Sequence, residues 1–353
     1  MADNTSTNMS TTHAVESTPA AVTTPAPSVV GPLINQQVYL WFTVAVFVIG
    51  LGGNIIVVVA FMIFKKLRSL GSVFIVNTAV SDILVGLLGD LFIIVGIATH
   101  GEYLINNKPL CDMSSFLCAS VCIVSVWSIA AASFNGYIRV CHHLAYAKIY
   151  TPATVGLMLL GIWSAGILIL LPTLFGWGSH YYDPVLMFCI PSSTSSVSYT
   201  FFMVFTGWGI PLVVIVFSFT RIILTVRASS KNLKKGEKGV SKGEMAVIRS
   251  VMVIAVYFFA AYLFLLIILL MGDNYGGSAA SIVFAVVLAH THCSFTGILY
   301  AMTNKRYRTS YKRMFYFCWH RGKVGVELTT SSGSSGGGMS STVSGAVTGV
   351  TNA

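Results

Sequence analysis

Charged residues are scarce in this sequence. Only 9% of its 353 residues are Asp, Glu, Lys or Arg, while 55% are hydrophobic. Soluble domains devote about a quarter of their residues to charge, so this chain cannot cover a water-facing surface. The net charge of +10 does not indicate nucleic-acid binding, because the basic residues lie in short loops between long apolar runs. These observations exclude an ordinary soluble domain and a nucleic-acid-binding protein.

Other common features are also missing. Residues 1–30 are rich in Thr, Ser, Ala and Pro and lack the basic start and apolar core of a cleavable signal peptide. The first apolar run is therefore expected to act as an uncleaved signal. None of the seven cysteines forms a Cys-x-x-Cys pair, which argues against a zinc or redox site. Neither a nucleophile–base–acid set nor a metal-ligand spacing is visible, so we expect no enzymatic activity.

What the chain does contain is a series of long apolar segments. Each is long enough to cross about 30 Å of hydrocarbon as a helix, and none shows the alternation of a barrel strand. The sequence therefore predicts an all-α membrane protein, a seven-transmembrane helix bundle. The predicted spans are Val38–Ile63, Val73–Ile97, Met113–Val140, Val155–Leu174, Ser198–Val226, Met245–Met271 and Ala279–Met302.

Basic residues fall almost entirely on one side of this bundle. Of the 21 Lys and Arg residues, all but Lys108 lie in or beside the segments that follow spans one, three, five and seven. An excess of Lys and Arg marks the cytoplasmic side. We therefore expect a multi-pass plasma-membrane protein with an extracellular N-terminus and a cytoplasmic C-terminus.

The spans divide the chain into four regions. Both ends have too few large apolar residues to fold alone. The expected regions are a disordered extracellular tail (1–37), the seven-span domain (38–303), a short amphipathic helix on the membrane surface (304–319) and a disordered cytoplasmic tail (320–353).

Three modification sites are predicted near the two ends of the chain. Asn4 and Asn8 begin N-x-[ST] sequons in the N-terminal tail and are candidates for glycosylation. In the helix after span seven, Tyr307, Tyr311 and Cys318 share an apolar face that we expect to contact membrane lipids. Cys318 is either palmitoylated or a membrane-buried free thiol.

Two cysteines lie on the predicted outer side. Cys111 begins span three, and Cys189 lies in the long loop after span four. Both face the oxidising compartment, so a disulfide between them is predicted, with two free thiols as the alternative. This bond would hold the loop across the mouth of the bundle.

Several motifs occur in a familiar order along the spans. Span one contains Gly53-Asn54, span two contains Asn77-x-Ala79-Val80-Ser81-Asp82, and later spans contain Trp163, Pro211 and Tyr300. With these motifs, residues 38–316 resemble a class A (rhodopsin-like) G-protein-coupled receptor. The chain is most similar to the melatonin-receptor group. That likeness rests on Lys65-Lys66-Leu67-Arg68, Asn135-x-Tyr137, Cys141-His142-x-Leu144, Tyr182-Asp183-Pro184 and Tyr300 with Asn304, Arg308 and Tyr311.

The resemblance implies a receptor that passes an extracellular small-molecule signal to a heterotrimeric G protein, arrestin or both. It places Asn135, Gly136, Tyr137, Arg139 and Tyr300 toward the G protein. Gly136 stands where the family has Arg, and span six lacks the family's Cys-Trp-x-Pro. An atypical or non-coupling receptor therefore remains an alternative. A transporter or channel is less favoured, because no internal repeat is visible.

The resemblance also implies an ion site in mid-membrane. Asp82 matches the sodium-site aspartate of class A receptors, and Ser125 would be its partner in span three. His292 and Thr296 lie on one face of span seven, where the family has Asn residues. A sodium ion near Asp82 is one interpretation, and a structural hydrogen bond to Asp82 is the other. No other cofactor is expected.

The ligand cannot be named from the resemblance. Cys118 replaces the aspartate that amine receptors need, and His290 lies at the level of the lysine that retinal needs. Thr173, Tyr181 and Gly207 replace an Asn, a Gln and a His of the melatonin group. These five positions are the candidate ligand contacts, although His290 could instead only bond a neighbouring residue. We expect a different small molecule or no ligand.

Overall fold

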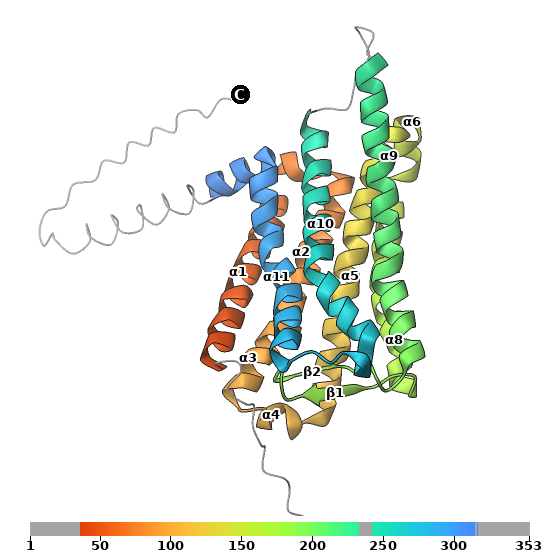
Figure 1. Ribbon diagram of the computed structural model, residues 1–353. Coiled ribbons are helices and arrows are strands. Elements are labelled where there is room, and N and C mark those ends of the chain that lie inside the picture. Colours follow the sequence, from red (N-terminus) through yellow and green to blue (C-terminus); the bar gives the residue numbers. More distant parts are fainter. Residues whose placement is uncertain (1–35, 233–241, 315, 317–353) are drawn as a thin grey trace, which may run out of the picture.

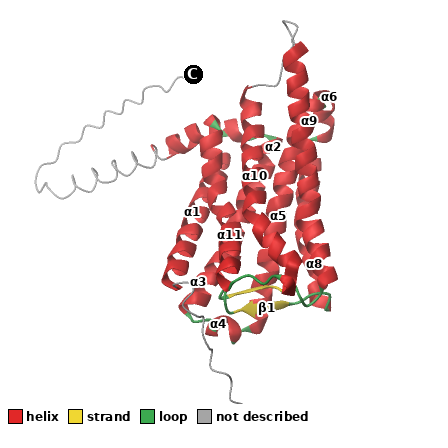
Figure 2. Cartoon of the chain, in the orientation of Figure 1, coloured by secondary structure: helices red, strands yellow, loops and turns green. Residues whose placement is uncertain are grey.

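Seven helical spans form the bundle that the hydropathy predicts. The computed structural model describes residues 36–232, 242–314 and 316. The helices run side by side, and a small pair of strands lies across one end (Figures 1 and 2). We call this the hairpin end, and we call the opposite end, which carries Lys66, Arg139 and Arg306, the basic end. The spans are Gln36–Ile63, Leu70–Ala98, Lys108–Cys141, Pro152–Phe175, Val197–Ala228, Met245–Met271 and Ala279–Thr303.

These spans are built from the following elements. Span one is α1 (Gln36–Ile63), span two is α2 (Leu70–Val85), η2 (Gly86–Asp90) and α3 (Leu91–Ala98), and span three is α5 (Lys108–Cys141). Span four is α7 (Pro152–Leu170) with η3 (Leu171–Phe175), and span five is α8 (Val197–Val204), η4 (Phe205–Gly209) and α9 (Ile210–Asn232). Span six is α10 (Lys242–Met271), and span seven is α11 (Ala279–Thr303). Short connecting elements are η1 (Lys65–Leu67), α4 (Glu102–Ile105), α6 (His143–Ile149) and η5 (Gly272–Asn274).

Hydroxyl side chains fix where several helices begin. Ser69 caps α2 by accepting a hydrogen bond from the backbone N–H of Ser72. Thr151 and Thr154 form a reciprocal capping box at the start of α7, with Pro152 at the first helical position. Each cap satisfies backbone donors that a helix otherwise leaves free. The spans therefore start at short polar residues just outside the apolar runs.

A disulfide holds the hairpin over its end of the bundle. β1 (His180–Asp183) and β2 (Phe188–Pro191) pair antiparallel, with Tyr182 opposite Cys189. Cys189 is bonded to Cys111 at the start of α5, which confirms the predicted disulfide. Tyr39 in α1 also donates a hydrogen bond of 3.1 Å to the carbonyl of Leu186 in the turn. The hairpin is thus tied to two spans.

Two spans contain π turns, which their apolar pattern does not predict. The first is η2 in span two, and the second is η4 in span five. Pro211 follows η4, and a proline ring clashes with the carbonyl four residues earlier, so a wider turn is favoured there. Span six has no such break. α10 is one continuous α-helix, as the missing proline leads one to expect.

Glycines allow the closest helix contacts. A Cβ on Gly297 in α11 would lie 2.7 Å from the carbonyl carbon and oxygen of Gly53 in α1. A Cβ on Gly166 in α7 would lie 2.7 Å from the carbonyl oxygen of Ser120 in α5. Small residues at helix interfaces let backbones approach closely in membranes. Without them, these pairs of spans would have to separate.

Buried polar side chains add hydrogen bonds between the spans. Asn54 in α1 donates to the carbonyl of Cys293 in α11 over 2.7 Å. Asn77 in α2 donates to Ser128 in α5 over 2.7 Å and accepts from the indole of Trp163 in α7 over 3.0 Å. The class A motif residues therefore connect spans one with seven, and two with three and four.

After span seven, residues 305–314 are helical, as predicted. The expectation that Tyr307 faces lipid is wrong. Its side chain is 1% exposed, and its ring stacks on Tyr300 with centroids 5.4 Å apart. An apolar helix face packs equally well on lipid or on protein, so periodicity could not distinguish the two. Asn4, Asn8 and Cys318 lie outside the described residues.

Candidate functional site

A largely apolar pocket with a cavity volume of about 110 Å³ lies beneath the hairpin. Its walls come from α5, the hairpin, α8, η4, α10 and α11. Of the five candidate ligand contacts, Cys118 and His290 line it. The other lining residues are Ser115, Ala119, Cys122, Phe188, Cys189, Ile190, Pro191, Met203, Trp208, Tyr262, Leu265, Leu266, Leu269 and Val286. We call it the hairpin pocket. Its apolar lining suits a small molecule with an apolar body.

His290, which lines this pocket, is paired with an aspartate that does not itself line it. The His290 Nδ1 atom lies 2.5 Å from the Asp90 Oδ1 atom, and both side chains are largely buried. Asp90 belongs to the π turn of span two, and His290 belongs to α11. The carboxylate fixes the orientation of the imidazole ring, as such partners do in other histidine sites. The ring therefore offers a fixed polar edge in an apolar wall.

The other three candidate contacts lie outside the lining of this pocket. His180 lies between two hydroxyl groups. Its Nε2 atom is 3.0 Å from the Thr173 hydroxyl, and its Nδ1 atom is 2.6 Å from the Ser115 hydroxyl. Burial lowers the pKa of His180, so its ring is neutral at pH 7 and can bridge two hydroxyls. Tyr181 is 42% exposed and donates to Asp183 over 3.2 Å. Gly207 packs toward Ile123.

A second group of buried side chains lies deeper in the bundle. Ser125 donates a hydrogen bond of 2.7 Å to Asp82 Oδ1, as the sequence predicted for this pair. His292 Nε2 lies 3.5 Å from the same oxygen. The Thr296 hydroxyl donates to the backbone carbonyl of His292 over 2.8 Å. Cys293, which the sequence did not suggest, lies 3.2 Å from His292 Nε2 through its Sγ atom.

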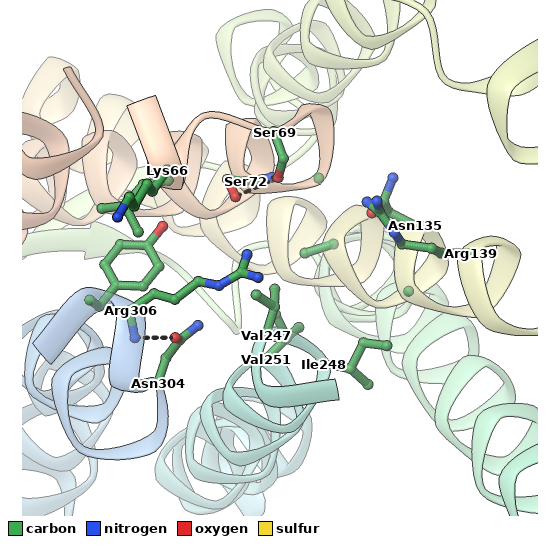
Figure 3. Close-up of a pocket in the computed structure, with 15 residues that line it drawn as sticks. Lys66, Ser69, Ser72, Asn135, Arg139, Val247, Ile248, Val251, Asn304 and Arg306 are labelled. Carbon is green, nitrogen blue, oxygen red and sulfur yellow. Dashed lines mark hydrogen bonds between the residues drawn. The ribbon is translucent and has the colours of Figure 1, made fainter. Parts of the chain in front are cut away.

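At the basic end, a pocket with a cavity volume of about 140 Å³ opens between spans two, three and six and the segment that follows span seven. Asn135, Gly136 and Arg139 line it from α5, and Lys66 and Arg306 line it from other elements. Figure 3 shows Arg306 reaching in from one side and Asn135 and Arg139 from the other. None of the described residues that line it is acidic. The basic-end pocket therefore has a positive rim.

Tyr137 and Tyr300 do not line this pocket. The Tyr137 hydroxyl lies 2.8 Å from His142 Nε2, and its ring packs edge-on against Phe217. Tyr300 is buried and stacks on Tyr307. Arg139 is held by Tyr146, whose hydroxyl accepts a bond of 3.2 Å and whose ring lies 4.7 Å from the guanidinium carbon. Thus the structure groups three of the five predicted residues around one pocket.

Seven spans, a disulfide-tethered hairpin above an apolar pocket, and a second pocket at the opposite end define a seven-transmembrane receptor. Comparison with known proteins narrows this class. Residues 53–316 match the family described as "7 transmembrane receptor (rhodopsin family)". The chain therefore belongs to the rhodopsin family, the class A G-protein-coupled receptors, and it is a multi-pass membrane protein without enzymatic activity.

Individual relatives agree with this assignment. The chain is 29% identical to human melatonin receptor type 1B over 304 residues, which cover 84% of this chain and 82% of the relative. It is 29% identical to the zebrafish (Danio rerio) melatonin receptor type 1B-B, over 79% of this chain and 81% of that one. Squid rhodopsin shares the fold, with a TM-score of 0.70 and 21% identity over 82% of this chain and 90% of that one. The chain is thus a melatonin-receptor-like member of the family.

Proposed function

We propose that this receptor recognises a small, mainly apolar molecule in the hairpin pocket and passes the signal to a heterotrimeric G protein, to arrestin or to both at the basic end. The observation that carries the proposal is the apolar pocket lined by His290, whose ring is held by Asp90. Burying ionisable side chains inside a membrane costs free energy, so such residues are candidates for a function. His290 is therefore a candidate polar contact for the ligand.

Melatonin, which the relatives' names suggest, is not the ligand that this pocket favours. The resemblance places an Asn, a Gln and a His of the melatonin group at three positions of this chain. Here these positions are Thr173, Tyr181 and Gly207, and none of them lines the pocket. The polar contact comes instead from His290 in span seven. We therefore propose an apolar molecule with a single hydrogen-bonding group at the end that meets His290.

A paired substitution in α10 tests the ligand site. Leu266 lines the hairpin pocket, whereas Leu270, one turn further, does not line it and is 40% exposed. Wild-type cells would first be screened with a library of indoles and other apolar small molecules, with cAMP, calcium and arrestin readouts. For any activator, Leu266→Trp should raise the half-maximal concentration about tenfold or more, which corresponds to about 1.4 kcal/mol. The reason is that the larger tryptophan side chain would fill space that the ligand needs.

Leu270→Trp is the matched control and should leave the response unchanged. His290→Ala should also weaken the response, because it removes the polar contact. A screen without any activator, or equal effects of the two tryptophan variants, would count against ligand binding in the hairpin pocket.

We further propose that the hairpin end is extracellular and the basic end cytoplasmic. The asymmetry of Lys and Arg supports this orientation. An epitope tag before Asn4 should bind antibody on intact cells, because it would lie outside. A tag after Lys323 should bind only after permeabilisation. Labelling of the C-terminal tag on intact cells would reverse the proposed orientation.

A further inference from the structure

Three potential metal ligands meet in the core of the bundle, where spans two and seven face each other. The carboxylate of Asp82, Nε2 of His292 and Sγ of Cys293 offer ligand atoms that all lie within 4.8 Å of one another. All three residues are buried, with exposures of 1% for Asp82, 1% for His292 and 1% for Cys293. Ser125 donates to Asp82 and so orients the carboxylate. We call these residues the Asp82 cluster.

The cluster contains more acceptors than donors. His292 Nδ1 lies 2.7 Å from the carbonyl of Ala289, so the proton of a neutral ring belongs on that nitrogen. Nε2 then directs a lone pair toward Asp82 Oδ1, 3.5 Å away, which is itself an acceptor. The second oxygen of Asp82, Oδ2, is buried and has no hydrogen-bond partner among the described residues. The Cys293 thiol can donate to Nε2 over 3.2 Å, but the unpaired Oδ2 is costly unless a cation or a proton lies beside it.

We propose that the Asp82 cluster binds a single transition-metal ion of the zinc type. Tetrahedral zinc, with bonds of about 2.0 Å to nitrogen and oxygen and 2.3 Å to sulfur, holds its ligand atoms roughly 3.3–3.6 Å apart. The His292–Asp82 and Cys293–His292 distances of 3.5 and 3.2 Å are close to this spacing. A carboxylate and a thiolate neutralise the charge of a divalent ion, which a low-dielectric core requires.

The donor types select this ion over the alternatives. Nitrogen and sulfur ligands favour zinc-like ions, whereas hard cations prefer oxygen. A sodium ion would be held by oxygens, so it would use neither the nitrogen of His292 nor the sulfur of Cys293. A proton on His292 Nε2 would also satisfy Asp82, but it would make no use of the thiol of Cys293. Dependence on Cys293 therefore distinguishes a metal from a proton.

The hairpin pocket offers a route to the cluster. The ring of Tyr262 lines that pocket and packs against the ring of His292, with centroids 5.2 Å apart. The Asp82 cluster thus lies about one aromatic ring below the pocket. Because Asp82 and His292 come from different spans, a bound ion would join span two to span seven. This inference is independent of which ligand the pocket takes.

The full-length receptor, purified in detergent and stripped with a chelator, provides the test. Titration with Zn²⁺ alone should give one tightly bound ion per chain by elemental analysis and should raise the thermal unfolding temperature. Co²⁺ in its place should give the charge-transfer absorption of a cobalt–thiolate bond. Cys293→Ser should remove this absorption and weaken zinc binding at least about tenfold, because it deletes the sulfur ligand at nearly constant volume.

Cys118→Ser is the matched control, since Cys118 is a buried thiol that lines the hairpin pocket. It should bind zinc as the wild type does. The unfolding temperature of each variant without metal shows whether it folds. Equal zinc binding by Cys293→Ser, no zinc binding by folded wild-type protein, or stabilisation by Na⁺ alone would each overturn the proposal.

Discussion

Replacement of Gly136 by arginine should raise basal G-protein signalling about fivefold or more. A fivefold change corresponds to about 1 kcal/mol, the lower end of typical coupling free energies. A Cβ at this position would lie 3.3 Å from Ile248 Cγ1 in α10 and 3.7 Å from Ile222 Cδ1 in α9. The first carbons of an arginine side chain would therefore lie between the apolar side chains of Ile248 and Ile222. Because an unpaired buried guanidinium is costly, the variant favours states in which α10 moves away from α5 and the basic-end pocket widens.

Gly136→Met is the matched control, because it adds similar length without charge. It should fill the apolar gap and leave the basal signal unchanged. Arg139→Ala should lower any native signal, since Arg139 is the cation that α5 supplies to the basic-end pocket. The measurement is G-protein activation in cells at equal surface expression. Robust signalling that neither Gly136→Arg nor Arg139→Ala changes would contradict this account of the basic end.

Substitution of Gly166 by valine should sharply reduce the amount of folded receptor. A Cβ there would lie 2.7 Å from both the carbonyl oxygen of Ser120 and Cγ2 of Val124 in α5. The carbonyl belongs to a helix backbone and cannot move aside locally, so α7 would have to separate from α5. Overpacking of this kind costs about 1–3 kcal/mol and sometimes more. Thermal unfolding of purified protein and surface expression would measure the loss.

Gly161 lies on the same helix and provides the control. A Cβ on Gly161 would meet nothing within 4 Å. Gly161→Val therefore makes the same chemical change without a contact, and it should unfold at nearly the wild-type temperature. If both variants unfold alike, the close approach of α7 and α5 at Gly166 does not limit stability.

Hydropathy and charge were sufficient to predict the seven spans and the cysteine pair. A long apolar segment in lipid must satisfy its own backbone hydrogen bonds, so it forms a helix. Only two cysteines lie in the predicted outer segments, so each could pair only with the other. The contact between Asp82 and Ser125 was also predicted, because the family motif fixes both positions. These features depend on local composition or on a motif that carries its own geometry.

The sequence did not reveal the contact between Asp90 and His290, nor the position of Cys293. Asp90 was visible as a mid-membrane acid, but the π turn that ends at Asp90 changes the direction of its side chain. Cys293 follows His292 directly, and helical periodicity assigns neighbours to different faces. Side-chain length nevertheless brings Sγ to 3.2 Å from the ring nitrogen. Such contacts depend on rotamers, which periodicity does not contain.

The π turn in span two also affects how this receptor is aligned with other members of its family. A π turn holds one residue more than an α turn over the same part of a helix. If the second span of a relative is α-helical throughout, a gapless alignment will pair correctly up to Val85 and be one position out of register from Leu91 onward. Residues 91–98 would then be equated with partners that point about 100° away. A one-residue gap within Gly86–Asp90 restores structural equivalence, so Asp90 must be compared by superposition rather than by position number.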